Sequence, residues 1–351
     1  MKKEDYKRLN DYLNDVFIYL SKYDGFFIQN MHMIFSLNSM FYEKLKGIDL
    51  RHNFYENNLT YEDVFNLARN EIEKINPKYL EKFDKLINPG RLEIFKQEEN
   101  ITTKENNEEK TPRIYNYEDV LTLIHEFMHS TNSSKNMGEY RYILTEFFSI
   151  YFEMFSQNNL LESGINPSEL NIFYRITDTG KISKRINEYD LAFMSYNLLG
   201  NIKEDSYEDL EKYHIVSSTK EEFEDACTKL LKYFDYHEIK YNNENKVFNL
   251  YDYRKCISRL FSSSYRYLYG TLFSCYLLEN GNKDKIVWLN DHINDEGIKN
   301  MDLTSVLRII DIDLTEKNIN KKLVDNAQNY YENLSKYSVK GEKEKSLTYN
   351  V

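Results

Sequence analysis

The chain contains few of the residues that interrupt helices or cross-link a fold. Its 351 residues include only 4 prolines, 11 glycines and 3 cysteines. So few helix-breaking residues favour long helices over a β architecture with many turns. The cysteines, at positions 227, 256 and 275, lack the paired spacing of a disulfide framework or of a cysteine-ligated metal. We therefore expect a mainly helical protein that resides in a reducing cytoplasm.

The chain also has no long apolar segment and no excess of positive charge. No stretch approaches the roughly 20 apolar residues that a membrane-spanning helix needs, and the charged residues 1–6 do not resemble a secretory signal. The formal net charge of −11 argues against a general nucleic-acid-binding protein, whose phosphate contacts require clustered lysine and arginine. We expect neither a membrane nor a nucleic acid as a partner.

Capping signals and apolar periodicity predict a multi-helix, mainly α fold. A break around Asp24 and Gly25 separates two helices within residues 4–47. Capping boxes at residues 60–63 and 218–221 open further helices, and the last two long helices are expected over 254–278 and 315–336.

One segment could add a small β edge to this helical fold. Two short apolar pieces at residues 91–95 and 113–117 flank a polar run from 97 to 110. Such pieces can pair as strands around the polar loop. The same residues could instead form a solvated connection, so both alternatives stay open.

The most informative motif is H-E-x-x-H at residues 125–129, which follows an apolar run over 120–124. Residues four apart lie on one face of a helix, so His125 and His129 can bind a single ion. Glu126 lies near that face, where its carboxylate can hold a water molecule and take its proton. A short pattern of this kind also arises by chance, on a solvated helix face that binds no metal.

A second helical pattern supplies more acidic residues. Glu146, Ser149 and Glu153 stand at i, i+3 and i+7, on one face of a helix whose other positions are almost all apolar. Buried carboxylates are costly unless they are paired or bind a cation, and a catalytic zinc usually takes three protein ligands. We therefore predict Glu146 as the third zinc ligand and Glu153 as the residue that orients a ligand histidine. The alternative pairs both glutamates with Arg141 or a distant lysine.

These blocks resemble the thimet oligopeptidase and oligoendopeptidase F family of zinc metallopeptidases. Residues 119–130 are similar to the family's zinc-site helix, D-V-x-T-L-x-H-E-x-G-H, and residues 146–153 to its E-x-x-S-x-x-x-E segment, which holds the third zinc ligand. Residues 265–270 resemble its Y-x-Y-x-Y segment, and residues 306–315 resemble the G-x-D-L motif that starts the last helix. The blocks occur in the family's order, and the resemblance covers most of the chain from about Leu59 onward.

The resemblance implies catalytic roles for tyrosines. In the family, a tyrosine of the Y-x-Y-x-Y segment hydrogen-bonds the scissile carbonyl as it becomes an oxyanion. By alignment this residue is Tyr267, with Tyr265 as the second candidate. Family members also carry a histidine shortly before this segment, whereas no histidine occurs here between His237 and His292. Stabilisation of the oxyanion could therefore rest on tyrosine alone or involve Arg259.

The resemblance implies a zinc-dependent endopeptidase that hydrolyses oligopeptides. We divide the chain into a helical amino-terminal region (1–58) that is shorter than in the family, a catalytic region (59–338) and a flexible tail (339–351). The missing histidine and the short amino-terminal region leave one alternative open, a catalytically impaired relative that binds peptides or a protein partner. A metalloprotease dedicated to one protein substrate is the other alternative.

Overall fold

The computed structural model describes residues 1–23, 25–45, 59–86, 119–131, 141–170, 172, 174–212, 219–244 and 250–337. Every regular element within these ranges is helical, which confirms the prediction of a mainly α fold. The strands considered for 91–95 and 113–117, and the tail over 339–351, lie outside the described residues.

The elements range from single turns to α11, which has 31 residues. In chain order they are α1 (Lys3–Tyr23), α2 (Gly25–Leu45), α3 (Tyr61–Ile75), the 3-10 turn η1 (Pro77–Tyr79), α4 (Leu80–Leu86), α6 (Val120–Thr131), α7 (Arg141–Glu162), the 3-10 turn η2 (Pro167–Glu169), α8 (Tyr174–Leu199), α9 (Ser206–Lys212), α10 (Lys220–Glu244), α11 (Leu250–Asn280), α12 (Lys283–His292), α13 (Glu296–Lys299), α14 (Leu303–Ile309) and α15 (Ile319–Ser335).

The local capping signals explain where several helices begin. Thr60 forms the predicted capping box, because its hydroxyl accepts from the Asp63 amide (3.1 Å) while Asp63 accepts from the Thr60 amide (2.9 Å). The box predicted at 218–221 is wrong by one residue. Thr219 accepts from the amide of Glu222, and Glu222 accepts from the amide of Thr219. The sequence offers two overlapping S/T-x-x-E patterns there, and α10 uses the second.

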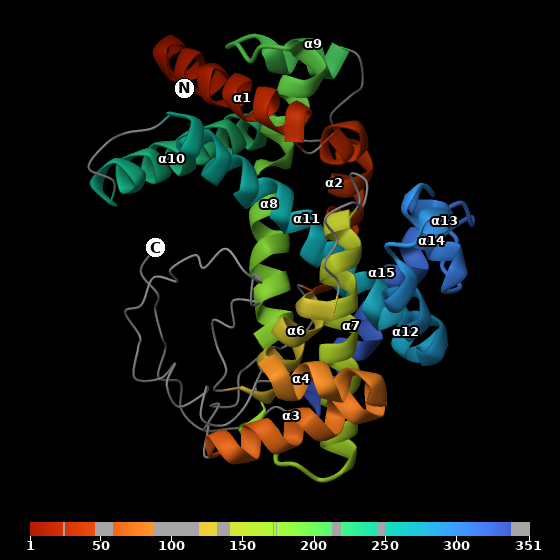
Figure 1. The fold of residues 1–351 in the computed structure, drawn as a ribbon. Helices are drawn as coiled ribbons and strands as arrows, with labels where there is room; N and C mark the ends of the chain where they lie inside the picture. Colours follow the sequence, from red (N-terminus) through yellow and green to blue (C-terminus); the bar gives the residue numbers. More distant parts are fainter. Residues whose placement is uncertain are drawn as a thin grey trace.

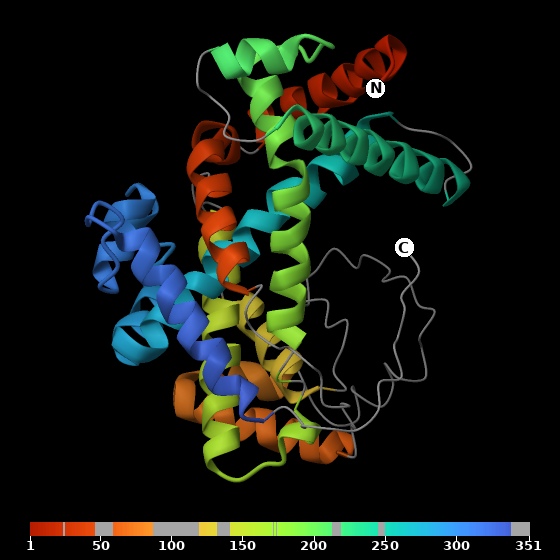
Figure 2. The same cartoon turned by 180° about the vertical axis from the view of Figure 1, so that it is seen from behind.

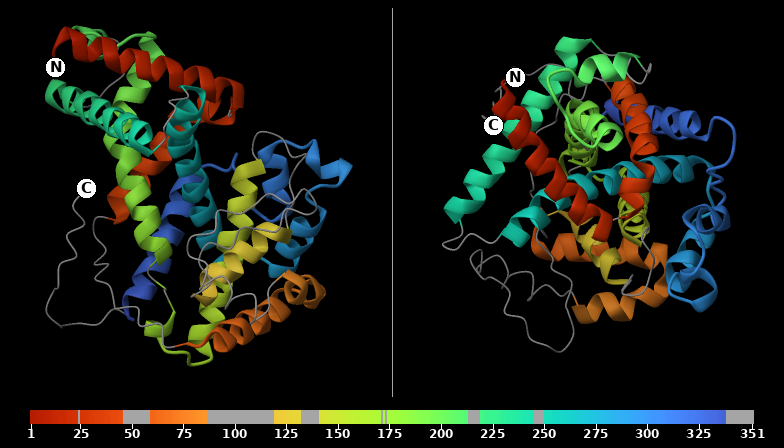
Figure 3. Two further views of the ribbon diagram at one scale, coloured as in Figure 1. Left: turned by 60° about the vertical axis from the view of Figure 1, so that its left-hand side comes forward. Right: turned by 90° about the horizontal axis from the view of Figure 1, so that it is seen from above.

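The long helix α11 forms the centre of the arrangement. It runs diagonally through the molecule and packs on α7 and α8, as well as on α1 and α15 (Figure 1). Helices α1, α9 and α10 lie at one end of the molecule, and α3 and α4 lie at the other (Figure 2). Helices α12, α13 and α14 gather at one side (Figure 3). The metal-motif helix α6 packs on α7 and α3.

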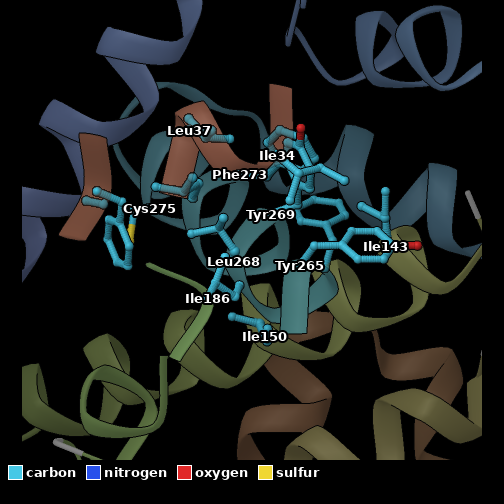
Figure 4. Packing of buried hydrophobic residues seen from close by; sticks show 14 of the residues in the cluster. Ile34, Leu37, Ile143, Ile150, Ile186, Tyr265, Leu268, Tyr269, Phe273 and Cys275 are labelled. Atoms are coloured by element: carbon cyan, nitrogen blue, oxygen red, sulfur yellow. The ribbon is translucent and has the colours of Figure 1, made fainter. Parts of the chain in front are cut away.

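The hydrophobic core surrounds α11 and joins the chain's early and late parts. Figure 4 shows Tyr265, Leu268 and Phe273 of α11 packed near side chains of α2, α7 and α8, among them Ile34 and Ile150. Burying a large apolar side chain stabilises a fold by about 1.5–3 kcal/mol. Because α1 and α2 pack on α8, α11 and α15, one buried cluster spans residues on both sides of position 58. A domain boundary at that position stays a prediction.

Helix α7 is buried on all sides, as its sequence predicts. Phe147, Phe148 and Phe152 are at most 1% exposed, and the helix lies between α6 and α11, with which it makes its main contacts. A helix that is apolar all round belongs in the interior of a protein. The carboxylates of α7 are therefore held at fixed positions inside the molecule.

Candidate metal centre

The helix that carries H-E-x-x-H is anchored at its start and along its apolar face. Asp119 precedes α6 and caps it, since its Oδ1 accepts from the Leu121 amide (2.9 Å) and its Oδ2 from the Thr122 hydroxyl (3.3 Å). Burial raises the pKa of Asp119 to about 6. Leu123 and Phe127 are fully buried. These contacts direct the opposite face of α6, which carries both motif histidines, toward α7.

Three potential ligand atoms form a small triangle. Nε2 of His125 and Nε2 of His129 are 3.0 Å apart, and Oε2 of Glu146 lies 3.7 Å from each of them. Adjacent ligands of a tetrahedral zinc, each about 2.0–2.1 Å from the ion, are separated by about 3.3 Å. The three distances bracket this value, so the group could hold one metal ion. The structure thus brings together all three residues that the sequence predicted as ligands.

The charge states of these residues also fit a cation. Oε2 of Glu146 is buried and has no hydrogen-bond partner among the described residues. Burial raises the pKa of Glu146, although the neighbouring His125 and Arg175 oppose this effect. Burial lowers the pKa of His129 well below its ordinary value, so this imidazole is neutral at neutral pH and its lone pair is available. A bound cation would compensate the otherwise unpaired carboxylate of Glu146.

Glu126 stands between the two motif histidines on α6. Its side chain is half-buried on α6. Burial raises its pKa, the nearby His125 lowers it, and the negative charge of Glu146 raises it further, with a net upward shift. A carboxylate with a raised pKa is a stronger base than an exposed one, which suits general-base chemistry near neutral pH.

On the other side of His125, Glu153 and Arg175 form a buried ion pair. Nδ1 of His125 lies 2.8 Å from Oε2 of Glu153, the contact expected of a residue that orients a ligand histidine. The Arg175 guanidinium donates to both oxygens of Glu153, from Nε to Oε1 (3.2 Å) and from Nη2 to Oε2. Burial alone would raise the pKa of Glu153, but Arg175 and His125 outweigh it and the pKa is lowered. Glu153 is therefore ionised, and its function toward a metal stays a prediction.

Sequence reasoning missed Arg175, which stands in the first turn of α8. It is 7% exposed and lies within the otherwise apolar segment 172–176. A lone arginine in such a segment, together with two predicted buried glutamates on another helix, is the signal that could have identified it. The sequence alternative that paired these glutamates with Arg141 or a lysine did not include Arg175.

The two candidate tyrosines occupy different environments. Tyr267 is partly buried, and its ring centroid lies 5.6 Å from Cζ of Arg175. Burial raises its pKa, and the charges of Glu146 and Glu126 contribute further. Tyr265 is fully buried in the core, where its ring lies 5.5 Å from that of Phe27. The structure brings only the first of the two tyrosines to the candidate centre, because residues two apart project from different faces of a helix.

A glycine permits α11 to approach α7 beside Glu146. A Cβ atom at Gly270 would lie 2.8 Å from Cδ1 of Ile150, 3.3 Å from the amide nitrogen of Phe147 and 3.4 Å from the carbonyl carbon of Glu146. A larger residue there would displace the Ile150 side chain and press on the backbone of α7, so glycine suits this close contact. The close approach explains how Tyr267 and Glu146, on separate helices, reach one site. The side chain of Arg259 lies outside the described residues.

No known family identifies this arrangement. Neither a protein-family model nor a curated protein nor a solved structure matches the chain. Among the described helices, none has the length and apolar character needed to cross a bilayer.

Proposed function

We propose that the protein is a zinc-dependent endopeptidase that hydrolyses oligopeptides in the cytoplasm. The observation that carries this proposal is the triangle formed by His125, His129 and Glu146, with Glu126 on the same helix as both histidines. Two imidazoles and one carboxylate suit zinc, whereas magnesium and calcium prefer sets of oxygen ligands. The resemblance of four sequence blocks to the thimet oligopeptidase and oligoendopeptidase F family supports the same conclusion.

Each residue would have a distinct function in peptide hydrolysis. A bound zinc would supply a Lewis acid that polarises the peptide carbonyl and acidifies a water molecule. Glu126 would accept the proton of the attacking water and then deliver it to the leaving amine. Tyr267 would donate a hydrogen bond to the carbonyl oxygen as that oxygen gains negative charge. Glu153 would hold His125 in position through its contact with Nδ1 of this histidine.

The test is cleavage of a mixed synthetic peptide library by the zinc-loaded protein, read by mass spectrometry. We expect new peptide termini to accumulate with the wild-type protein. The matched control is Glu126→Gln, which keeps the shape of the side chain and all three ligands. It should retain zinc and lose activity by roughly 100- to 10,000-fold, the usual contribution of a general base. A zinc-loaded wild-type protein that cleaves no peptide would exclude the proposal.

One observation favours a second candidate, a relative that binds peptides without cleaving them. The family's histidine before the tyrosine segment has no counterpart between His237 and His292. Zinc content does not separate the two candidates, because an inactive relative can retain its metal. Saturable binding of library peptides by the zinc-loaded wild-type protein, without new termini, would favour the second candidate.

A further inference from the structure

Arg175 links the candidate metal centre to a helix that supplies none of its ligands. It extends from α8, whereas His125 lies on α6, and Glu146 and Glu153 lie on α7. Its guanidinium contacts Glu153, and its Nη2 lies 3.2 Å from Nδ1 of His125. The same group lies 5.6 Å from the ring centroid of Tyr267 on α11. One buried cation thus contacts three helices that converge on the site.

The protonation pattern of His125 depends on what faces its Nδ1. A neutral imidazole carries one proton, and the nitrogen without it is the one that can bind a metal. Nε2 of His125 is the atom that faces His129 and Glu146. The proton must therefore reside on Nδ1, and Nδ1 needs a hydrogen-bond acceptor. Of the two described groups beside Nδ1, Glu153 can accept, whereas Arg175 can only donate.

The distances around the Arg175 fork bear on this competition. Nε and Nη2 donate to Oε1 and Oε2 of Glu153, and Nη2 also lies 3.2 Å from Nδ1 of His125. A guanidinium proton shared with Nδ1 would require a lone pair there and would place the imidazole proton on Nε2, in the metal site. Oε2 of Glu153, however, lies 2.8 Å from Nδ1, closer than Nη2 does. Arginine can make this two-point contact with Glu153 because its guanidinium is planar. A lysine ammonium would carry the same charge but would not donate to both carboxylate oxygens in this fixed geometry.

We propose that Arg175 is a positioning residue of the metal centre. Its fork holds the carboxylate of Glu153 so that Glu153 accepts the Nδ1 proton of His125 and Nε2 remains free to bind the ion. Arg175 touches neither substrate nor metal and acts through Glu153. This inference rests on the proposed function only in that His125 is a metal ligand.

The primary measurement is the His125 tautomer in the metal-free protein, observed by nitrogen-15 NMR of the histidine ring. The wild-type protein should show the proton on Nδ1. Arg175→Lys, which keeps the positive charge, should show a mixed or reversed tautomer. A wild-type protein with its proton on Nε2, or an Arg175→Lys variant with an unchanged pattern, would overturn the proposal. This result depends on neither zinc nor peptidase activity.

Zinc affinity, measured against a chromophoric chelator, supplies the second readout. Loss of a residue that orients a ligand typically weakens metal binding by roughly 10- to 100-fold, and we expect a value in this range for Arg175→Lys and Arg175→Met. In the visible spectrum of the cobalt-substituted protein, both variants should show altered ligand-field bands. Wild-type affinity and an unchanged cobalt spectrum in Arg175→Lys would contradict the proposal.

A double variant separates positioning from general stability. Glu153→Gln and Arg175→Met together form a neutral pair, which avoids an unpaired buried charge if Arg175→Met alone fails to fold. If Arg175 acts through Glu153, the double variant should bind zinc as well as Glu153→Gln alone. An additional loss in the double variant would show that Arg175 acts by another route. Zinc binding without peptide cleavage in the wild-type protein would exclude the proposed function and leave this inference intact.

Discussion

Two glutamates on one face of α7 have opposite electrostatic environments. Glu153 lies on the closed side of His125, where it contacts Nδ1 of this histidine and pairs with Arg175. Glu146 lies on the open side, where its Oε2 faces two imidazoles and has no hydrogen-bond partner among the described residues. The pKa of Glu153 is lowered, because Arg175 outweighs the effect of burial, whereas burial raises the pKa of Glu146.

The difference distinguishes Glu153, which is paired within the protein, from Glu146, which faces the candidate metal position. An internal cation compensates Glu153, so this side of the centre is complete without a ligand. Glu146 has a raised pKa and an oxygen without a hydrogen-bond partner among the described residues, a pattern that recurs at functional sites in proteins. Glu153 and Arg175 therefore hold the Nδ1 side of His125, and the Nε2 side of this histidine remains available to a cation.

The largest effect should separate the two glutamates by the stability of the metal-free protein. Glu153→Gln removes the buried carboxylate that pairs with Arg175, so we expect the free energy of unfolding to fall by about 3–5 kcal/mol. Glu146→Gln instead removes an unpaired buried carboxylate and should leave this free energy unchanged or higher. Chemical denaturation in the presence of a chelator measures both. Equal destabilisation by the two changes would remove the distinction between the closed and open sides.

Zinc affinity should rank the same two variants in the reverse order. A structural zinc site contributes about 10–16 kcal/mol, so an even share for each of four ligands is about 2.5–4 kcal/mol, or roughly 70- to 900-fold in affinity. We expect this loss for Glu146→Gln. Glu153→Gln, which removes only an orienting contact, should lose roughly 10- to 100-fold. Competition with a chelator gives both values. Full zinc retention by Glu146→Gln would exclude this residue as the third ligand.

Tyr267 and Tyr265 of α11 allow a similar comparison of a residue at the candidate centre with one in the core, now for catalytic activity. The ring of Tyr267 lies beside Arg175 at the candidate centre, so Tyr267→Phe should lower kcat by about 100-fold with little change in KM if its hydroxyl meets the oxyanion. Tyr265→Phe is the matched control, because this ring is in the core and should not affect kcat beyond any loss of folded protein. Steady-state kinetics on a single cleaved peptide would measure both variants. A wild-type kcat in Tyr267→Phe would assign the oxyanion to another group.

The sequence predicted those features of the fold and site that depend on local spacing. The i, i+4 spacing places His125 and His129 on one helix face, and the i, i+7 spacing places Glu146 and Glu153 on one face of another helix. Arg175 could not be placed, since its approach to Glu153 depends on where tertiary packing positions α8. Likewise, the alignment did not distinguish the core position of Tyr265 from the site position of Tyr267. The role of Gly270 depends on a contact between two helices that no local pattern records.

As the pH falls, zinc binding at Glu146 should be lost before the ion pair between Glu153 and Arg175 is lost. Zinc binding requires ionised Glu146, whose pKa in the metal-free protein is raised above 4.5 by burial. Zinc affinity should therefore fall as the pH drops below this raised pKa, because a proton then competes with the metal for Glu146. Burial lowers the pKa of His129 well below 6.5, so this imidazole takes up a proton only at a lower pH than an exposed histidine does.

The pKa of Glu153, on the closed side, is shifted in the opposite direction from that of Glu146. Because the pKa of Glu153 is lowered below 4.5 in the folded state, its stabilising contribution is present above that value. This contribution is lost only as the pH falls through the lower folded pKa. A range of mildly acidic pH should therefore exist in which zinc dissociates while the Arg175–Glu153 pair holds the fold together. Chelator titrations and thermal unfolding at a series of pH values would test this order. Loss of the fold at a pH where zinc is still bound would show that the two sides do not titrate separately.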